Sequence, residues 1–328
     1  MYLQGIDVAG IATVIPRRSV GVAKWSEQFG ADVVERAVAT TGIRSVRVAA
    51  SGQRTSDLMF AAAVSLLKAL DLPVESVDAI VVVTTTPDKR TPATSCLLQD
   101  RLGLPTSTYA VDITHGCSGY PYGMSLAGML VSSGVASTVL LLAGDTLVRH
   151  LRSDDSASRF IFGDGASATV VRRGESFMLG QFHTDGSGAP SLFWDFPDPE
   201  SGETHAQMNG VDVMQFALTR VPRLLRSLRS HFDEAETPDA WTAVYLHQAN
   251  AFAVNHLARM CAMGPTRFPV AVERTGNTGP ASIPLCISHD AGDHELGVSA
   301  LVGFGVGWSW GGVVVDLSRT VVLPPQTV

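Results

Sequence analysis

The sequence predicts an α/β fold, and three features of its 328 residues lead to this class. Short runs that are apolar at successive positions alternate with stretches rich in small, helix-compatible residues, and such runs suit strands buried on both faces of a sheet. The chain is 45% hydrophobic and 17% charged, which supplies enough apolar material for a large core. A single core stops growing at about 250 to 300 residues, so we expect two subdomains or one duplicated unit.

The expected strands follow the apolar runs in chain order. They cover residues 79–84, 109–113, 138–143, 166–171, 243–246 and 300–308. In each half of the chain a buried strand leads through a Gly-rich or polar turn into a small-residue helix, so that 112–123 corresponds to 275–285. We therefore expect two similar halves, 1–172 and 173–328. The turn-rich segment 185–205 is expected to be a surface excursion.

Charge and apolar patterning argue against several classes of function. The net charge is -7 and the pI about 5.7, without the long basic run that nucleic-acid binding favours. Residues 1–16 lack the pattern of an export signal, so we expect a cytoplasmic protein. The apolar runs are too short to cross a membrane, which takes about 20 residues. The four cysteines form no C-x-x-C pair, which argues against a metal site or a disulfide framework.

The first candidate catalytic residue is Cys117. It follows the buried strand 109–113 directly and stands at the start of a helix. A helix N-terminus stabilises negative charge, so we expect a lowered thiol pKa and a nucleophilic thiolate. Gly116 and Gly119 flank the cysteine and permit a sharp turn with close approach of a substrate. The alternative interpretation is an inert, buried hydrophobe, as for most lone cysteines.

Two further polar motifs lie in the second half. His247 follows the apolar strand 243–246, at the carboxyl end where open α/β sheets place their ligands. Asn277 lies in a Gly-Asn-Thr-Gly segment at 276–279. Taken alone, the histidine also fits a structural role and the asparagine an ordinary turn. Together with Cys117 they suggest a catalytic set of three residues.

The three motifs resemble one family when they are taken in order. Gly-Cys-Ser-Gly at 116–119, His-Gln-Ala-Asn at 247–250 and Gly-Asn-Thr-Gly at 276–279 are similar to the ketoacyl synthase III branch of the thiolase-like condensing enzymes. Additional matching segments lie at 41–44, 162–166 and 303–311. The resemblance spans nearly the whole chain and implies a layered αβαβα fold, a homodimer, and no bound cofactor or metal.

The resemblance also implies a decarboxylative Claisen condensation. Cys117 would take an acyl group from coenzyme A or an acyl carrier protein, and a malonyl carrier-protein thioester would extend it to a 3-oxoacyl product. His247 and Asn277 would hydrogen-bond the malonyl thioester oxygen as it gains charge. The backbone N–H groups of Cys117 and Val306 would form the oxyanion hole for acyl transfer. Phe162 and Phe304 would line the substrate pocket.

Departures from the family pattern concern substrate recognition. Thr40 and Arg36 replace an Arg and a Trp that grip coenzyme A in the housekeeping enzymes. Thr91 stands where an aromatic residue of the partner subunit closes the acyl pocket. These departures suggest an enzyme of a specialised fatty acid or secondary-metabolite pathway.

Carrier-protein contacts also depart from the pattern. Phe252 and Gln215 stand where the family has basic residues that help bind substrate and carrier protein. A run of arginines at intervals of three could compensate by docking an acidic carrier protein, or it is a solvated helix face. The docking candidates are Arg220, Arg223 and Arg226.

The sequence leaves three alternatives to condensation. Cys117 could pass its acyl group to an alcohol or amine, although retention of His247 and Asn277 favours condensation. A papain-type hydrolase has the same residue order, but the buried α/β pattern is against it. A non-catalytic partner subunit is disfavoured because such subunits lose the nucleophile, whereas this chain keeps all three residues.

Overall fold

The computed structural model describes residues 1–195, 200, 206–234, 241–261 and 263–328. Its strands are β1 (Tyr2–Ile15), β2 (Ser19–Gly21), β3 (Ser45–Arg47), β4 (Ala79–Val83), β5 (Tyr109–Ile113), β6 (Thr138–Asp145), β7 (Gly165–Thr184), β8 (Leu192–Trp194), β9 (Ala206–Met208), β10 (Ala243–Leu246), β11 (Val298–Gly305), β12 (Ser309–Asp316), β13 (Val321–Val322) and β14 (Gln326–Thr327). Its α-helices are α1 (Val22–Phe29), α2 (Ala31–Thr41), α3 (Thr55–Ala69), α4 (Thr94–Leu102), α5 (Gly119–Ser132), α6 (Ser156–Arg159), α7 (Gly210–Glu234), α8 (Ala251–Cys261) and α9 (Ser282–Asp290). Short 3-10 turns are η1 (Val74–Ser76), η2 (Leu147–His150), η3 (Gly186–Ser191) and η4 (Gly279–Ala281).

A mixed sheet runs through the molecule in the strand order β10-β11-β12-β7-β6-β4-β5. β4 pairs in parallel with β5 and β6, and β10 pairs in parallel with β11. The long strand β7 runs antiparallel to β6, β12 and β1, and so joins the two sides of the sheet. Parallel strands with helical crossovers bury both faces, which explains the continuous apolar runs of β4 and β10.

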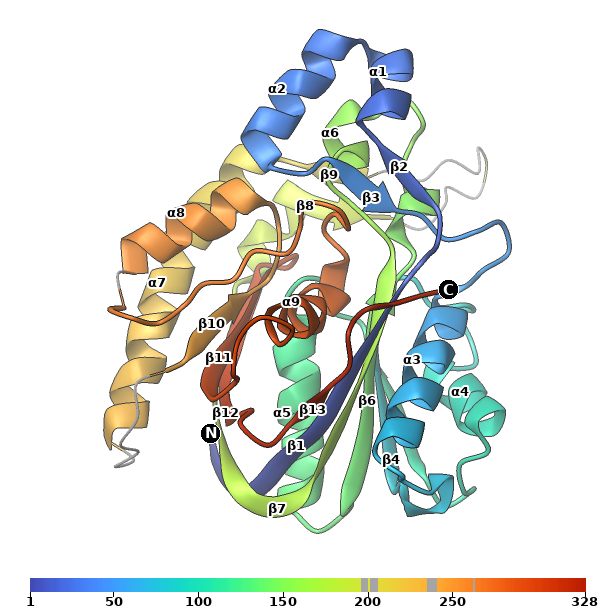
Figure 1. The fold of residues 1–328 in the computed structure, drawn as a ribbon, viewed down its shortest axis with the longest axis vertical. Coiled ribbons are helices and arrows are strands. Elements are labelled where there is room, and N and C mark those ends of the chain that lie inside the picture. Colours follow the sequence, from blue (N-terminus) through green and yellow to red (C-terminus); the bar gives the residue numbers. More distant parts are fainter. Residues whose placement is uncertain (196–199, 201–205, 235–240, 262) are drawn as a thin grey trace.

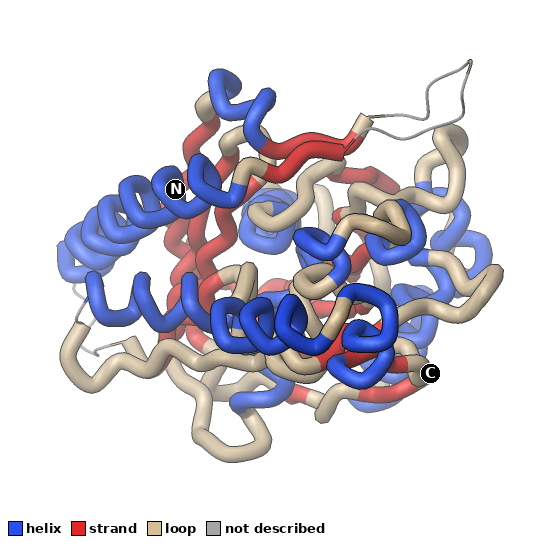
Figure 2. The backbone as a smooth tube through the Cα atoms, turned by 90° about the horizontal axis from the view of Figure 1, so that it is seen from above, coloured by secondary structure: helices blue, strands red, loops and turns tan. Residues whose placement is uncertain are grey.

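The layers alternate helices and sheet, as the αβαβα expectation requires. In Figure 1, α7 and α8 lie at the left, followed by β10 to β12, then α5 and α9, then β6 and β4, with α3 and α4 at the right. Three buried apolar clusters fill the interfaces between these layers. From above, helices lie on either side of the strands (Figure 2). The mixed α/β class is therefore confirmed.

Several predicted strand bounds agree with the structure. β5 and β10 have the expected bounds, and β4 ends one residue earlier than expected. β11 ends at Gly305, before the expected end at Trp308, because the chain turns there into β12. β7 continues to Thr184 instead of ending at Val171, so the expected boundary between the halves falls within one continuous strand.

Within the described ranges, no helix combines the length and the hydrophobicity that crossing a bilayer requires.

Candidate active site

Three residues that are distant in sequence line one cavity. Cys117, His247 and Asn277 all contribute to a cavity of about 120 Å³. Cys117 follows β5 and leads into α5, His247 follows β10, and Asn277 precedes η4 and α9. The helices α5 and α9 belong to the central layer (Figure 1). The structure thus brings together the three residues singled out in the sequence.

Close backbone packing surrounds the cysteine. The Gly119 N–H donates to the Gly116 carbonyl oxygen at 2.8 Å, which closes a tight turn around Cys117. A Cβ atom at Gly305 would lie 2.7 Å from the Cβ of Cys117 and 3.1 Å from its sulfur. The end of β11 therefore needs glycine at this position to approach the nucleophile.

The pKa of the Cys117 thiol differs from the expectation. Burial of the sulfur, and to a lesser extent the negative charge of Asp145, raise the pKa to about 12. Hydrogen bonds from the backbone N–H groups of Cys117 and Val306 act in the opposite direction. The expected lowering by the helix N-terminus is thus outweighed, because the site is enclosed and α5 begins only at Gly119. The free thiol is protonated at neutral pH.

His247 is a buried, neutral imidazole. Burial lowers its pKa to about 3, while a hydrogen bond with the backbone of Gly279 opposes this effect. Its Nδ1 atom lies 2.8 Å from the Ser282 hydroxyl oxygen, which also accepts the Gln248 N–H at 3.3 Å. A serine hydroxyl has one proton, which it can donate to Nδ1 and so leave the imidazole proton on Nε2. His247 then offers a neutral N–H donor.

The amide of Asn277 is oriented by its own loop. Its Oδ1 atom accepts the Gly279 N–H at 3.0 Å, which assigns the other position to the NH₂ group. Its backbone is paired with the segment before β7: the Asn277 N–H donates to Ile161, and the Gly163 N–H donates to the Asn277 carbonyl. The Asn277 amide therefore presents a donor beside His247, as stabilisation of a developing oxyanion requires.

The cavity walls are apolar. Phe162 and Phe304 line it, as expected, whereas Thr91 is exposed in the loop between β4 and α4 and does not line it within this chain. A contribution of Thr91 to a second subunit stays a prediction. Further lining residues were not predicted and include Ile161, Leu192, Trp194, Met208, Val213, Met214 and Ala217.

Two of these unpredicted residues come from the expected surface excursion. Leu192 and Trp194 belong to β8, which pairs with β9 and turns apolar side chains toward the cavity. Residues 196–199 and 201–205 of that excursion lie outside the described residues. Leu-Phe-Trp within a segment otherwise rich in Gly, Pro and Ser is the sequence feature that could have indicated this role.

The three predicted docking arginines differ in their surroundings. Arg220 is half-buried, with its guanidinium 3.5 Å from the Asp185 carboxylate and 5.3 Å from the centre of the Trp310 ring. Arg223 and Arg226 are exposed on α7. Arg220 thus packs α7 against the sheet, and a docking role of the three arginines stays a prediction.

Two buried carboxylates hold loops that surround the cavity. Asp145, at the end of β6, accepts five hydrogen bonds at 2.8 to 3.0 Å from the side chains and backbone of three consecutive threonines, Thr84, Thr85 and Thr86. Asp164 accepts the N–H groups of Ala49 and Val148, and burial raises its pKa to about 6. Both carboxylates fix loops around the cavity and do not line it.

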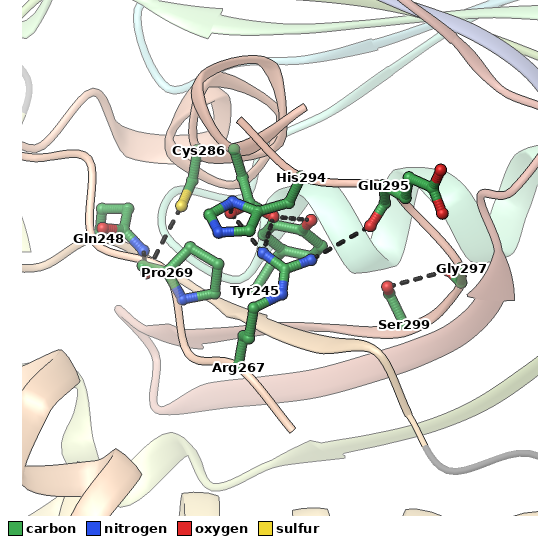
Figure 3. A network of polar contacts seen from close by, with 10 residues as sticks. Tyr245, Gln248, Arg267, Pro269, Cys286, His294, Glu295, Gly297 and Ser299 are labelled. Atoms are coloured by element: carbon green, nitrogen blue, oxygen red, sulfur yellow. Dashed lines mark hydrogen bonds and ion pairs between the residues drawn. The ribbon is translucent and has the colours of Figure 1, made fainter. Parts of the chain in front are cut away.

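A polar network around Asp290, at the end of α9, supports β10, the strand that leads to His247. Figure 3 shows Tyr245, Arg267 and His294 converging on one point at the end of α9. There the Asp290 carboxylate accepts the Tyr245 hydroxyl at 2.6 Å, two Arg267 contacts at 2.5 and 2.6 Å, and a contact from His294 at 3.0 Å. The network ties α9, which carries Ser282 at its start, to β10.

In the parts of the chain that the structure covers, no group of three His, Cys, Asp or Glu side chains is arranged to hold a metal ion.

Comparisons with known proteins agree on one family. Residues 111–188 match 3-oxoacyl-[acyl-carrier-protein (ACP)] synthase III, and residues 233–317 match the C-terminal part of the same family. The chain is 36% identical over 288 residues to beta-ketoacyl-[acyl-carrier-protein] synthase III of Xylella fastidiosa, covering 84% of this chain and 87% of that protein.

Solved structures give the same result. A 3-oxoacyl-(acyl-carrier protein) synthase from Burkholderia xenovorans superimposes with a TM-score of 0.92 at 31% identity, covering 100% of this chain and 98% of that one. The priming beta-ketosynthase from the R1128 polyketide biosynthetic pathway superimposes with a TM-score of 0.85 at 26% identity, covering 98% and 97%. The expected thiolase-like fold is thereby confirmed.

Proposed function

Since the chain belongs to the 3-oxoacyl-[acyl-carrier-protein] synthase III family and is an acyltransferase of the condensing type, we propose that it extends an acyl primer on Cys117 with a malonyl unit. The observation that carries the proposal is the convergence of Cys117, His247 and Asn277 on one apolar cavity. A nucleophile with two neutral hydrogen-bond donors fits acyl transfer followed by decarboxylation.

In the first half-reaction Cys117 receives the acyl group. Its sulfur loses a proton and attacks the thioester carbonyl carbon, a new carbon–sulfur bond forms, and the donor thiol leaves with a proton. The carbonyl oxygen becomes negative in the tetrahedral intermediate. The N–H groups of Cys117 and Val306, whose interaction with the sulfur acts to lower the pKa of the thiol, are suited to receive that oxygen.

In the second half-reaction His247 and Asn277 bind the malonyl thioester oxygen. The bond to the carboxylate breaks, carbon dioxide leaves, and its electron pair forms an enolate whose negative oxygen faces the two donors. The enolate carbon attacks the acyl-cysteine carbonyl and the thiolate departs, giving the 3-oxoacyl product. A neutral His247 suits this step because an N–H donor stays available at neutral pH.

The substrates follow from the same reaction. Both are thioesters, and the malonyl unit and product would be carried on an acyl carrier protein. Arg223 and Arg226, exposed on α7 behind the cavity-lining residues Val213 and Met214, supply positive charge for docking an acidic carrier. No cofactor beyond the thioesters enters the scheme. We place the enzyme in the cytoplasm as a homodimer, with Thr91 reaching the partner's acyl pocket.

A specialised pathway is the finer part of the proposal. It rests on Thr40 and Arg36, which replace residues for coenzyme A in the housekeeping pattern, on Phe252, which replaces a basic residue, and on Val306, which stands where the family pattern has a glycine. Similarity to the R1128 priming ketosynthase supports this inference. Thr91 in place of an aromatic residue favours a longer or more polar primer.

The test is intact-protein mass spectrometry after exposure to acyl thioesters of coenzyme A and of carrier protein, followed by a malonyl carrier-protein chase. We expect an acyl adduct on wild type and none on Cys117→Ala. Cys96→Ala is the matched control, because Cys96 is an exposed thiol on α4 that could react nonspecifically. This variant should keep the adduct.

The chase separates condensation from simple transfer. Discharge of the adduct with release of carbon dioxide and a 3-oxoacyl product supports the proposal. An adduct that persists with malonyl thioester but is discharged by an alcohol or amine would replace condensation by acyl transfer. Adduct formation on Cys117→Ala would remove the assigned nucleophile.

A further inference from the structure

Two backbone segments meet at the nucleophile with no side chain between them. A Cβ at Gly303 would lie 2.7 Å from the Cα of Ser118 and 2.8 Å from the Cys117 carbonyl oxygen. A Cβ at Gly305 would collide with Cys117 itself. The turn that carries the nucleophile and the strand β11 that leads to Val306 therefore touch through their backbones, so small shifts of either segment change the site.

A pair of buried serines joins the same two segments. The hydroxyl oxygens of Ser118 and Ser309 lie 2.6 Å apart, and both residues are almost fully buried, with exposed fractions of 1% and 2%. Ser118 follows Cys117 directly, and Ser309 is the first residue of β12. This contact is polar, whereas the close contacts described above between the two segments involve glycine residues and backbone atoms.

The direction of the hydrogen bonds follows from counting protons. The Ser309 hydroxyl lies 2.7 Å from the Val306 carbonyl oxygen, which can only accept, so the Ser309 proton is used there. Ser118 must then donate to Ser309, and it is free to accept from His115, whose Nδ1 lies 3.3 Å away. Burial lowers the pKa of His115, which favours a neutral imidazole, and donation to Ser118 places its one proton on Nδ1.

The series of hydrogen bonds from His115 through Ser118 to Ser309, called the hydroxyl relay below, ends on the turn that carries a proposed oxyanion donor. The Ser309 hydroxyl donates to the carbonyl of Val306, and the backbone N–H of Val306 acts to lower the pKa of the Cys117 thiol. At its other end the turn is fixed by two backbone hydrogen bonds between Trp308 and Asp185, at 2.7 and 2.9 Å. The serine pair links this turn to the nucleophile turn and so helps to set the distance between Val306 and Cys117.

We propose that Ser118 and Ser309 are positioning residues for acyl transfer: their hydroxyl relay fixes the Val306 turn against the nucleophile turn and so aligns the two N–H donors on one oxygen. This inference rests on the proposed function, in which those donors receive the thioester oxygen. Neither serine lines the cavity, so their effect is exerted through Val306 and Cys117.

The experiment compares two substitutions of nearly equal shape. Ser309→Thr keeps the hydroxyl and Ser309→Val removes it, while both add the same branching at Cβ. Ser118→Ala breaks the relay from the other side. Ser125→Ala is the matched control: Ser125 is also buried on α5 but donates locally to the Tyr122 carbonyl at 2.9 Å. Melting temperatures identify variants that fail to fold.

Two rates are measured for each variant. The rate of Cys117 acylation is followed by rapid quench and mass spectrometry, and carbon dioxide release is followed in a single turnover of fully acylated enzyme. We expect Ser309→Val and Ser118→Ala to acylate about tenfold more slowly. Ser309→Thr and Ser125→Ala should stay within about threefold of wild type. Carbon dioxide release, which depends on His247, should change by less than about threefold in all of them.

The double variant Ser118→Ala with Ser309→Val provides the second criterion. Because one relay is broken in either single variant, the double variant should acylate no more than about threefold more slowly than the singles. Independent, multiplying losses would overturn the inference, and so would equal rates for Ser309→Thr and Ser309→Val. A parallel loss of both half-reactions would mean a general structural role. Absence of an adduct on wild type would instead contradict the proposed function.

Discussion

Replacement of Asp145 by asparagine should lower the pKa of the nucleophile. The Asp145 charge is one cause of the raised Cys117 pKa. The carboxylate also lies close in space: its Oδ2 accepts the Thr85 hydroxyl at 2.9 Å, and the Thr85 methyl carbon is 3.6 Å from the position of a Cβ on Gly116. Asp145→Asn removes the charge and keeps the shape.

The magnitude follows from Coulomb's law. For an assumed separation of about 10 Å, two unit charges interact by about 1.7 kcal/mol at an effective dielectric of about 20. This energy corresponds to slightly more than one pKa unit. Removal of the Asp145 charge should therefore lower the pKa of Cys117 from about 12 by about one unit, because the thiolate no longer faces a negative neighbour. The thiolate fraction at pH 8 then rises about tenfold.

The asparagine side chain can be accommodated. Four of the five hydrogen bonds to Asp145 end on Oδ1, which an amide oxygen can replace. The remaining atom, Oδ2, accepts only the Thr85 hydroxyl, which can rotate and accept from an amide NH₂ instead. No buried donor has to lose its partner, so we expect Asp145→Asn to fold.

The assay is the pH dependence of Cys117 alkylation by iodoacetamide, followed by mass spectrometry. Asp145→Asn should react about tenfold faster than wild type at pH 8, with its profile displaced to lower pH. Thr85→Val is the control, because it removes one hydrogen bond to Asp145 and keeps the charge. An unchanged or slower reaction of a folded Asp145→Asn, or an equal acceleration by Thr85→Val, would refute the electrostatic explanation.

Three other predictions concern the site and its support. His247, whose pKa lies near 3, should show no titration of its imidazole NMR signals between about pH 5 and 8; a midpoint near 6.5 would contradict its burial as a neutral donor. The same shift makes the free energy of unfolding decrease as the pH falls below about 6.5, because only the unfolded state then gains the proton. Gly305→Ala should slow acylation at least about a hundredfold, since its Cβ meets the nucleophile at 2.7 Å, whereas Gly186→Ala, which faces open space, should leave the rate unchanged in the same mass assay. Asp290→Ala should lower the free energy of unfolding by about 3 kcal/mol in urea titrations, because its buried tyrosine and arginine partners lose their acceptor. His294→Ala, on the exposed side of that network, should lower the free energy of unfolding by less than about 1 kcal/mol. Equal losses for Asp290→Ala and His294→Ala would show that the tyrosine and arginine contacts do not account for the stability.

The positions of the catalytic candidates could be predicted from the sequence because they depend on local pattern. Cys117 and His247 each follow a continuous apolar run, and those runs became β5 and β10 with the expected bounds. Side chains that follow such strands gather at the carboxyl edge of the sheet. The pattern therefore located both residues before any tertiary contact was known.

Tertiary contacts decided the features that the sequence did not predict. The polar residues 172–176 look like the end of a strand, yet β7 continues through them because β1 pairs alongside. There the Asp7 carboxylate accepts the N–H groups of Glu175 and Ser176, which satisfies a bulge in the ladder. The local sequence pattern of 165–184 does not reveal this extension of β7, since the strand that pairs with it, β1, lies at the opposite end of the N-terminal half of the chain.

The thiol pKa was mispredicted for a related reason, and the error bears on mechanism. A helix N-terminus is a local feature, whereas the burial and the Asp145 charge that outweigh it come from distant segments. A high pKa leaves few thiolates at neutral pH, but each thiolate is more nucleophilic because nucleophilicity falls as pKa falls. On the proposed mechanism, acylation then depends on how well the Cys117 and Val306 N–H groups stabilise the charge that passes from sulfur to oxygen. Alignment of these two donors thus becomes the feature of the site on which the rate of the first half-reaction depends most.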